Sequence, residues 1–273
     1  MMSYKNSVIR TAKIIAPALF LLLVISSFTA SASESGIAIF KNNPSSNGAE
    51  YADTYAKAMN YKNPSVSSFA LLRVSPKNSG NYSTAQACDL WDFVNKEWRI
   101  ISDPRGPDYI SSAPGTIRAG LRGDSDDYSV FLASSIMSLG GRCRIVAATD
   151  SGDNTWHTYP EVFIGYGDDE AVKILKYTAT RYDCEKIFYS ITDESGMKGY
   201  WMNLDWAIQR YYGPRYYAYG STKAEIEAYH PGRVYFPADS ATFYYADGRS
   251  DKQLPAYGYY QRTKFGTDTL NEI

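Results

Sequence analysis

The apolar residues of this chain change from helical spacing to strand alternation at Gly140-Gly141, and this change constrains the fold more than any other feature. Residues 125–139 repeat apolar side chains at helical intervals, which is typical of a helix buried in a core. The two glycines then end the helix. Residues 156–165 alternate between two faces, as a strand does. Helices followed by strands form the α+β pattern, so we expect a helix packed on an antiparallel sheet.

Weaker patterns extend this scheme in both directions. Short helical segments precede the buried helix, and Ser83-Thr84-Ala85-Gln86 has the sequence of a capping box that starts another helix. A stretch with several glycines and prolines, from Asp103 to Gly123, reads as a loop. The short upstream helices are expected near Ala49–Met59 and Val66–Leu72, and the downstream strands at Arg144–Ala148, Val172–Ala179, Lys186–Thr192 and Gly199–Trp206.

The first 32 residues are typical of an export signal. Lys5, Arg10 and Lys13 give a positive start. An apolar run from Ile14 to Ile25 follows, and Ala30-Ser31-Ala32 then offers the small residues that signal peptidase accepts. A membrane span needs ~20 apolar residues, so a cleaved signal peptide is the first interpretation and an uncleaved N-terminal anchor the second. Both predict a secreted or cell-surface protein, with membrane contact only through this segment.

Composition narrows the functions that remain. The formal net charge is -1, with 44% hydrophobic and 21% charged residues, as expected of a folded globular protein. This balance favours neither nucleic acid nor an anionic membrane surface as a partner. The chain has 25 tyrosines, which either pack on a sheet or line a binding surface. The region after residue 210 is rich in them.

The three cysteines leave two redox arrangements open. An exported protein can form disulfides, so Cys88, Cys143 and Cys184 allow one bridge plus one thiol, in a connectivity that sequence cannot assign. Cys143 lies in a strand pattern, where a buried and unreactive thiol is expected.

Only His157 and His230 can support chemistry that needs histidine. His230 lies in a Tyr-His-Pro-Gly turn, where we expect exposure to solvent. His157 begins a strand after a polar loop, and a lone strand histidine is structural in most proteins. Its significance therefore depends on its neighbours.

Ser125 opens the buried helix, within Gly123-Asp124-Ser125-Asp126-Asp127. A helix N-terminus carries partial positive charge and unpaired N–H groups, which favour a nucleophile and can stabilise an oxyanion. A serine beside acidic residues is equally what an ordinary helix start requires. The aspartates lack the glycine and distal glutamate of an EF-hand loop, so we expect no metal, and we expect no cofactor.

Four blocks in order resemble the transglutaminase-like superfamily over residues 84–206. They are Gly123–Tyr128, Gly140–Val146, His157-Thr158-Tyr159-Pro160-Glu161-Val162 and Trp201–Asp205. The resemblance implies a papain-like α+β fold whose nucleophile helix packs on an antiparallel sheet. It also implies a catalytic triad in which Ser125 stands at the nucleophile, His157 is the general base and Asp205 orients the histidine.

The sequence departs from this family at the nucleophile, where the family has cysteine and this chain has Ser125. A thiol is partly ionised at neutral pH, whereas a hydroxyl must lose its proton during attack. The family's second oxyanion donor has no clear match, and Trp91 and Trp98 are the upstream candidates. The substitution leaves two interpretations open: a weakened or inactivated enzyme, and a natural binding module.

The resulting organisation has four parts: an export segment at residues 1–32, a helical lead-in at 33–83, the transglutaminase-like domain at 84–210 and a tyrosine-rich extension at 211–273. The first functional hypothesis is acyl transfer or hydrolysis on amides of peptides or proteins. The alternatives are a non-catalytic module that binds a peptide, a glycan or another cell-surface polymer, and a purely structural domain.

Overall fold

The computed structural model describes residues 37–39, 48–103, 108–150, 155–206, 230–233, 238–263 and 267–273. The expected export segment at residues 1–32 and most of residues 207–237 lie outside these ranges. No helix within them is long and apolar enough to cross a membrane.

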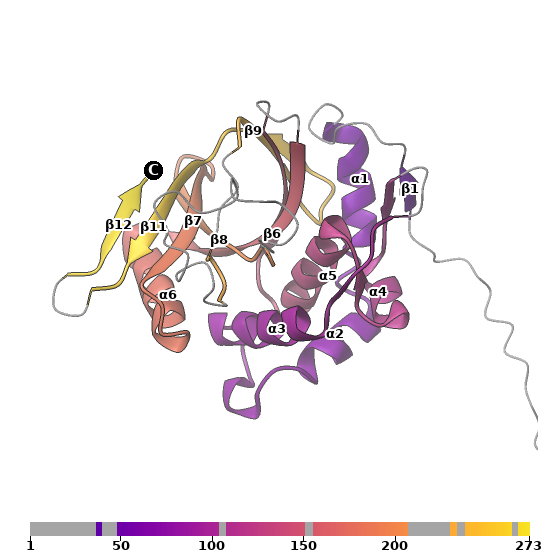
Figure 1. The fold of residues 1–273 in the computed structure, drawn as a ribbon, viewed down its shortest axis with the longest axis horizontal. Helices are drawn as coiled ribbons and strands as arrows, with labels where there is room; N and C mark the ends of the chain where they lie inside the picture. The colour runs from indigo at the N-terminus through magenta and orange to yellow at the C-terminus, as the bar shows by residue number, and fades with distance from the viewer. Residues whose placement is uncertain are drawn as a thin grey trace, which may run out of the picture. The chain divides into compact units, whose positions relative to one another are not determined.

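An antiparallel sheet forms the centre of the described fold (Figure 1). Its eight described strands have the spatial order β10-β9-β5-β6-β8-β7-β11-β12. The strands are β5 (Cys143–Asp150), β6 (Thr155–Tyr166), β7 (Lys186–Asp193), β8 (Lys198–Asn203), β9 (Ser240–Tyr244), β10 (Ser250–Lys252), β11 (Ala256–Gln261) and β12 (Thr269–Glu272). The α+β class expected from the sequence is therefore confirmed.

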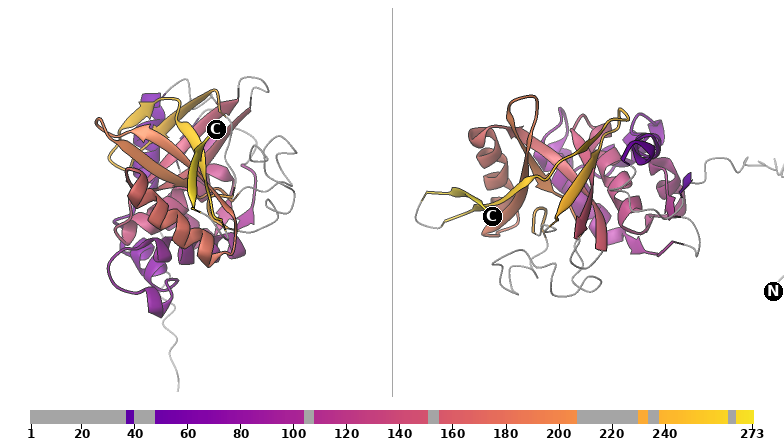
Figure 2. Two further views of the ribbon diagram at one scale, coloured as in Figure 1. Left: turned by 90° about the vertical axis from the view of Figure 1, so that its left-hand side faces the viewer. Right: turned by 90° about the horizontal axis from the view of Figure 1, so that it is seen from above.

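The helices precede most of the sheet along the chain, and α1 to α5 gather on one side of it in Figure 1. Helix α6 lies against the strands on the other half of the sheet, as both views of Figure 2 show. The helices are α1 (Gly48–Ala58), α2 (Pro64–Leu71), α3 (Thr84–Glu97), α4 (Ala113–Ala119), α5 (Ser125–Ser138) and α6 (Asp168–Arg181). A 3-10 turn covers Pro76–Asn78, and two small sheets pair β1 (Ile37–Ile39) with β3 (Asp108–Ile110) and β2 (Arg99–Ile100) with β4 (Arg122–Gly123).

Helix α5 is the buried helix that the sequence predicts. All of its residues from Asp126 to Ile136 are buried, in one apolar core with residues of α1 to α4 and α6. Gly141 allows the tight passage from α5 into β5, because a Cβ there would lie 2.5 Å from Ile136 and 2.7 Å from Tyr82. The packing of α5 against β5 and β6 confirms the predicted helix-on-sheet arrangement.

The two faces of the sheet have different cores. Toward α5 and α6 the strands present Cys143, Ile145, Val162 and other apolar residues of the main core. The opposite face holds a second cluster of Val146, Ala148, Tyr159, Trp201, Ala241, Phe243 and Tyr245. Strand alternation explains this division, since neighbouring residues on a strand point to opposite faces.

The strand expected at Val172–Ala179 is wrong, because this segment lies inside helix α6. Its buried residues are Ala171, Leu175, Thr178 and Ala179, which are spaced for a helix. Three acidic residues, Asp168 to Glu170, occupy the first turn and favour a helix start through the helix dipole. Val172, Ile174 and Thr178 are β-branched and have a strand propensity, but amphipathic packing prevails over it.

The cysteines and the C-terminal region complete the description. All three thiols are free and buried, so the arrangement with a disulfide is absent. Four strands between residues 240 and 272 belong to the central sheet. The domain boundaries expected at residues 83/84 and 210/211 stay predictions.

Candidate functional site

His157 and Asp205 form a buried pair. Nε2 of the imidazole lies 2.8 Å from Oδ2 of the carboxylate, and the two side chains are 3% and 7% exposed. A carboxylate that accepts a hydrogen bond from Nε2–H fixes the neutral imidazole in that tautomer. Nδ1 is then the ring nitrogen that can take up a proton. The arrangement is that of a base with its orienting carboxylate.

The pairing depends on strands β6 and β8. Glu161 of β6 is in register with Asn203, the last residue of β8, and Asp205 follows two residues later. Asn203 Oδ1 accepts a hydrogen bond of 2.6 Å from the backbone N–H of Asp205. This local turn directs the carboxylate toward His157 instead of continuing the strand.

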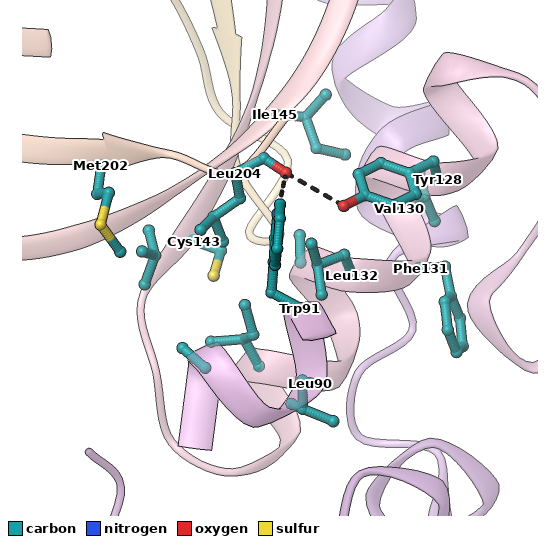
Figure 3. Packing of buried hydrophobic residues seen from close by; sticks show 14 of the residues in the cluster. Leu90, Trp91, Tyr128, Val130, Phe131, Leu132, Cys143, Ile145, Met202 and Leu204 are labelled. Carbon is teal, nitrogen blue, oxygen red and sulfur yellow. Dashed lines mark hydrogen bonds between the residues drawn. The ribbon is translucent and has the colours of Figure 1, made fainter. Parts of the chain in front are cut away.

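The carbonyl of Leu204 anchors the same turn to two helices (Figure 3). It accepts hydrogen bonds from Trp91 Nε1 at 3.1 Å and from the Tyr128 hydroxyl at 3.2 Å. Asn95 Nδ2 in turn donates to the Tyr128 hydroxyl at 2.9 Å. Leu204, the residue before Asp205, is therefore fixed to both α3 and α5.

Ser125 is the first residue of α5, and it is half-buried. Asp124 is the N-cap residue, and Asp126 and Asp127 lie in the first turn, where acidic groups favour the helix dipole. The Ser125 carbonyl accepts a hydrogen bond of 2.6 Å from the Ser129 hydroxyl, so its local structure is that of a regular helix start.

Helix α5 and strand β6 run in the same direction. Only four residues separate the end of α5 at Ser138 from the start of β5 at Cys143, so the chain reverses between them. Strand β5 is antiparallel to β6, which makes the directions of α5 and β6 alike.

This common direction brings Ser125 and His157 to the same end of the helix and sheet. Tyr128 is tied to Leu204, whose N–H donates to the Pro160 carbonyl at 2.9 Å. Ser125 precedes Tyr128 by three residues, and His157 precedes Pro160 by three. The His157 side chain leaves the strand on the face that it shares with Tyr159. Among the described residues, no hydrogen bond joins Ser125 to His157 directly.

Three carboxylates gather beside the start of α5. Oxygens of Asp103, Asp124 and Asp127 lie within 4.8 Å of one another. Among the described residues, this group comes nearest to the geometry of a cation site. Two of them already accept backbone hydrogen bonds: Asp103 from Tyr109 at 2.7 Å, and Asp127 from Ser111 at 2.6 Å. We assign no metal to this group.

Protonation of Asp127 relieves the repulsion within this group. Burial, together with the charges of Asp124 and Asp103, raises the pKa of Asp127 to about 7, although hydrogen bonds from Ser111 oppose the shift. Gly123 allows this carboxylate to approach the backbone. Its φ is +154°, and a Cβ at this position would overlap the Asp127 side chain.

A second ionic group lies on the sheet face that carries Tyr159, Trp201 and Phe243, and its Glu161 comes from the strand that carries His157. Arg144 Nε donates to Glu161 Oε2 at 2.8 Å, and its other nitrogens donate to Thr192 and Ser190. The guanidinium lies 4.0 Å from the Trp201 ring centroid and 3.8 Å from that of Phe243. Burial raises the pKa of Glu161, against the opposing influence of Arg144.

His230 is buried, which corrects the expectation that it is exposed. It is 3% exposed, and its Nδ1–H donates to the Pro231 carbonyl at 2.8 Å. Burial lowers the pKa of His230 to about 4, so the ring is neutral at physiological pH. The turn residues around it gave no sign of this burial. His230 takes no part in the His157–Asp205 pair.

The two indoles that the sequence offered as oxyanion donors are both engaged elsewhere. Trp91 Nε1 donates to Leu204, and Trp98 Nε1 donates to the Gly123 carbonyl at 3.3 Å. Asn203 and Tyr128, which hold the turn around Asp205 by hydrogen bonds, were not among the residues predicted from the sequence. The two-residue spacing of Asn203 and Asp205, typical of an Asx turn, is the signal that could have identified the first of them.

Comparisons with known proteins are sparse. No family model matches the sequence, and no curated protein does. A candidate cysteine protease from Cytophaga hutchinsonii is similar in structure, with a TM-score of 0.37 and 11% sequence identity. The alignment covers 82% of this chain and 63% of that protein. At this level of similarity, function has to be inferred from the residues of the chain itself.

Proposed function

We propose that this chain is an exported, transglutaminase-like protein that acts on amides of peptides or proteins by acyl transfer or hydrolysis. Ser125 is the nucleophile, His157 the general base and Asp205 the residue that orients the base. The buried hydrogen bond of 2.8 Å between His157 and Asp205 carries the proposal. The turn that holds Asp205 is anchored through Leu204 and Tyr128 to helix α5, which begins at Ser125.

The chemistry follows from these positions. The Ser125 oxygen attacks the amide carbonyl while its proton passes to His157 Nδ1. Asp205 stabilises the imidazolium that forms. The C–N bond then breaks as His157 returns the proton to the amine that leaves, and an acyl ester remains on Ser125. Water completes hydrolysis, and a second amine completes acyl transfer.

Serine makes the first step demanding. A hydroxyl cannot be stored as an ion pair with imidazolium, as a thiol can, so the proton must move during attack. We expect the Ser125 form to be much weaker than a cysteine form of the same site.

The Ser125→Cys variant tests this proposal. Under the proposal, the positive end of α5 and the His157 imidazole should lower the pKa of the new thiol below the free value of about 8.5. We expect iodoacetamide at pH 6 to modify it faster than any native cysteine. Burial raises the pKa of Cys88 and of Cys184 to about 12, and it raises the pKa of Cys143 as well, so the native thiols give a low background.

The added variant His157→Ala separates activation from simple exposure. It should slow alkylation of the new thiol several-fold, because the imidazolium partner is lost, while His230→Gln should not. Modification at the rate of a free thiol, with or without His157, would contradict the catalytic proposal.

A non-catalytic binding module is the second candidate. The serine itself favours it, as does the absence of a direct Ser125–His157 hydrogen bond among the described residues. In that case the Ser125→Cys thiol would be unactivated, and binding of peptides or cell-surface glycans would be the property to measure.

Export is a separate part of the proposal. We infer that the mature chain begins at Ser33, after Ala30-Ser31-Ala32. N-terminal sequencing of the protein from its native host should return Ser33. An intact Met1 in the membrane fraction would support the uncleaved anchor instead.

A further inference from the structure

Gly232 lies between two strands of the central sheet, at the point where their pairing stops. Strands β7 and β8 pair as far as Tyr189 and Met202. The same register would next place Phe188 opposite Asn203. Instead, the Phe188 N–H donates to the Gly232 carbonyl at 2.5 Å, and the Gly232 N–H donates to the Asn203 carbonyl at 2.7 Å. The backbone of Gly232 therefore replaces a direct hydrogen bond between the two strands, and β8 ends at this point.

Glycine is required for this insertion. The φ of Gly232 is +67°, in the left-handed region that residues with a side chain rarely adopt. A Cβ at this position would lie 2.5 Å from Cγ2 of Ile187 and 3.0 Å from the carbonyl oxygen of Phe188, both in β7. A larger residue would therefore push the segment away from the strand.

Arg233, the next residue, binds the chain on the other side of Asp205. Its Nη2 donates to the Trp206 carbonyl at 2.8 Å, and the Arg233 side chain is buried. A hydrogen bond from a charged donor is stronger than one between neutral groups. Gly232 thus holds the backbone before Asp205, and Arg233 holds it directly after.

The direction of the Asp205 carboxylate depends on both of these supports. Asn203 also binds the Asp205 N–H through its side chain, so a shift of Asn203 would move Asp205 with it. The hydrogen bond of 2.8 Å between Asp205 and His157 is sensitive to direction, because such bonds weaken steeply as their angle falls. A displaced carboxylate would no longer hold the imidazole in one tautomer.

We propose that Gly232 and Arg233 are positioning residues that fix the direction of Asp205, an inference that rests on the proposed acyl transfer. They act through the backbone on either side of the carboxylate, and this role needs no contact with the substrate. Both residues fall within 211–273, the range expected to be a tyrosine-rich extension. That region is then needed to complete the site and is not a separate unit.

The test uses the full chain carrying Ser125→Cys and reads two signals. The first is the population of the Nε2–H tautomer of His157, followed by ¹⁵N-histidine NMR. The second is the pH dependence of alkylation by iodoacetamide. Arg233→Met removes the donor and keeps an unbranched side chain. We expect the tautomer to lose population and alkylation at pH 6 to slow about 5- to 10-fold, because Asp205 holds the imidazole less firmly.

Two further arginine variants interpret that result. Arg233→Lys keeps a charged donor and should recover part of both signals. Arg262→Met is the matched control, because Arg262 also donates to a backbone carbonyl, that of Ala179 in α6 at 3.0 Å. Its two signals should stay at the values of the Ser125→Cys parent.

Gly232→Ala tests the insertion independently and should cause the same losses, because its Cβ displaces the segment from β7. Gly248→Ala is its control: the φ of Gly248 is +84°, but a Cβ there would meet nothing within 4 Å. Backbone strain without displacement should change neither signal. Misfolding is recognised separately, since it would open the buried thiols of Cys88, Cys143 and Cys184 to alkylation.

The outcomes separate the positioning role from the proposed function. If the thiol of the Ser125→Cys parent reacts no faster than a free thiol, both are overturned. If that thiol is activated, but its alkylation and the His157 tautomer are the same in the Arg233→Met and Gly232→Ala variants as in their controls, only the positioning role is overturned.

Discussion

Asn203 is the residue on which the direction of the Asp205 side chain depends most closely. Its amide oxygen holds the Asp205 backbone N–H at 2.6 Å, and the side chain is 3% exposed. Without this acceptor the N–H would be buried and unsatisfied, so the turn would rearrange to find a partner.

We therefore predict that Asn203→Ala weakens the His157–Asp205 hydrogen bond. The lost hydrogen bond is worth about 1 kcal/mol, so the alkylation rate of the Ser125→Cys thiol should fall about 5-fold. The chain has 2 histidines, so ¹⁵N-histidine NMR resolves the ring nitrogens of His157, and the Nε2–H tautomer should lose population. Asn203→Ser, which restores an acceptor, should recover most of both signals. Unchanged His157 resonances in the alanine variant would show that Asn203 has no positioning role.

The elements that sequence predicted well are those whose pattern agrees with their packing. The capping box at Ser83 starts α3, where the Ser83 N–H donates to Gln86 Oε1 at 3.3 Å. Helix α4 was missed because Pro114 and Gly115 lie in its first turn and suggested a loop, although proline is well tolerated there. Strands β9 to β12 were missed because they are short and mixed in polarity, and their pairing across the sheet decides their structure.

At the scale of the sheet, stability should depend on the buried Arg144–Glu161 pair. It joins β5 to β6 and, through Ser190 and Thr192, to β7. Glu161→Ala would leave the guanidinium of Arg144, which is fully buried, with only the more distant carboxylate of Glu194, 3.8 Å away, as a counter-charge. We expect a loss of about 3–5 kcal/mol in the free energy of unfolding, measured with urea.

Two comparisons sharpen this prediction. Replacing both residues by methionine should cost less than the single change, because no charge is then left buried. Asp53→Ala breaks an exposed pair with Lys57, whose side chains are 67% and 64% exposed, and should cost less than about 1 kcal/mol. A single Glu161→Ala variant as stable as the Asp53→Ala variant would show that the buried pair is not needed.

The site as a whole was less predictable than its parts. His157 and Asp205 are 48 residues apart in the chain, and strand pairing between β6 and β8 brings them together. Only the resemblance of four ordered blocks linked them from sequence. The anchoring of Leu204 by Trp91 and Tyr128 could not be foreseen, because these hydrogen bonds join residues that are far apart in the chain.

The stability of the whole molecule should depend on two buried groups, His230 and Asp127, whose contributions change in opposite directions with pH. The pKa of His230 falls on folding from 6.5 to about 4, worth about 3 kcal/mol, so its contribution to stability is present above pH 6.5 and is lost as pH falls through 4. The pKa of Asp127 rises from 3.8 to about 7, worth about 4 kcal/mol, so its contribution is present below pH 3.8 and is lost as pH rises through 7.

Single variants should expose each contribution in urea unfolding between pH 4 and 8. Asp127→Asn keeps an oxygen for the Ser111 N–H, and relative to the native chain it should gain stability steadily as pH rises from 4 to 7. His230→Gln should instead gain relative stability as pH falls from 6.5 toward 4, because the native chain must then keep a buried imidazole neutral against protonation. In the native chain the two trends largely cancel over this range, so its own profile should be flatter than either difference.

If the difference between Asp127→Asn and the native chain were independent of pH, the carboxyl group of Asp127 would have to be ionised throughout. The three carboxylates at the start of α5 would then need a counter-charge from outside the group.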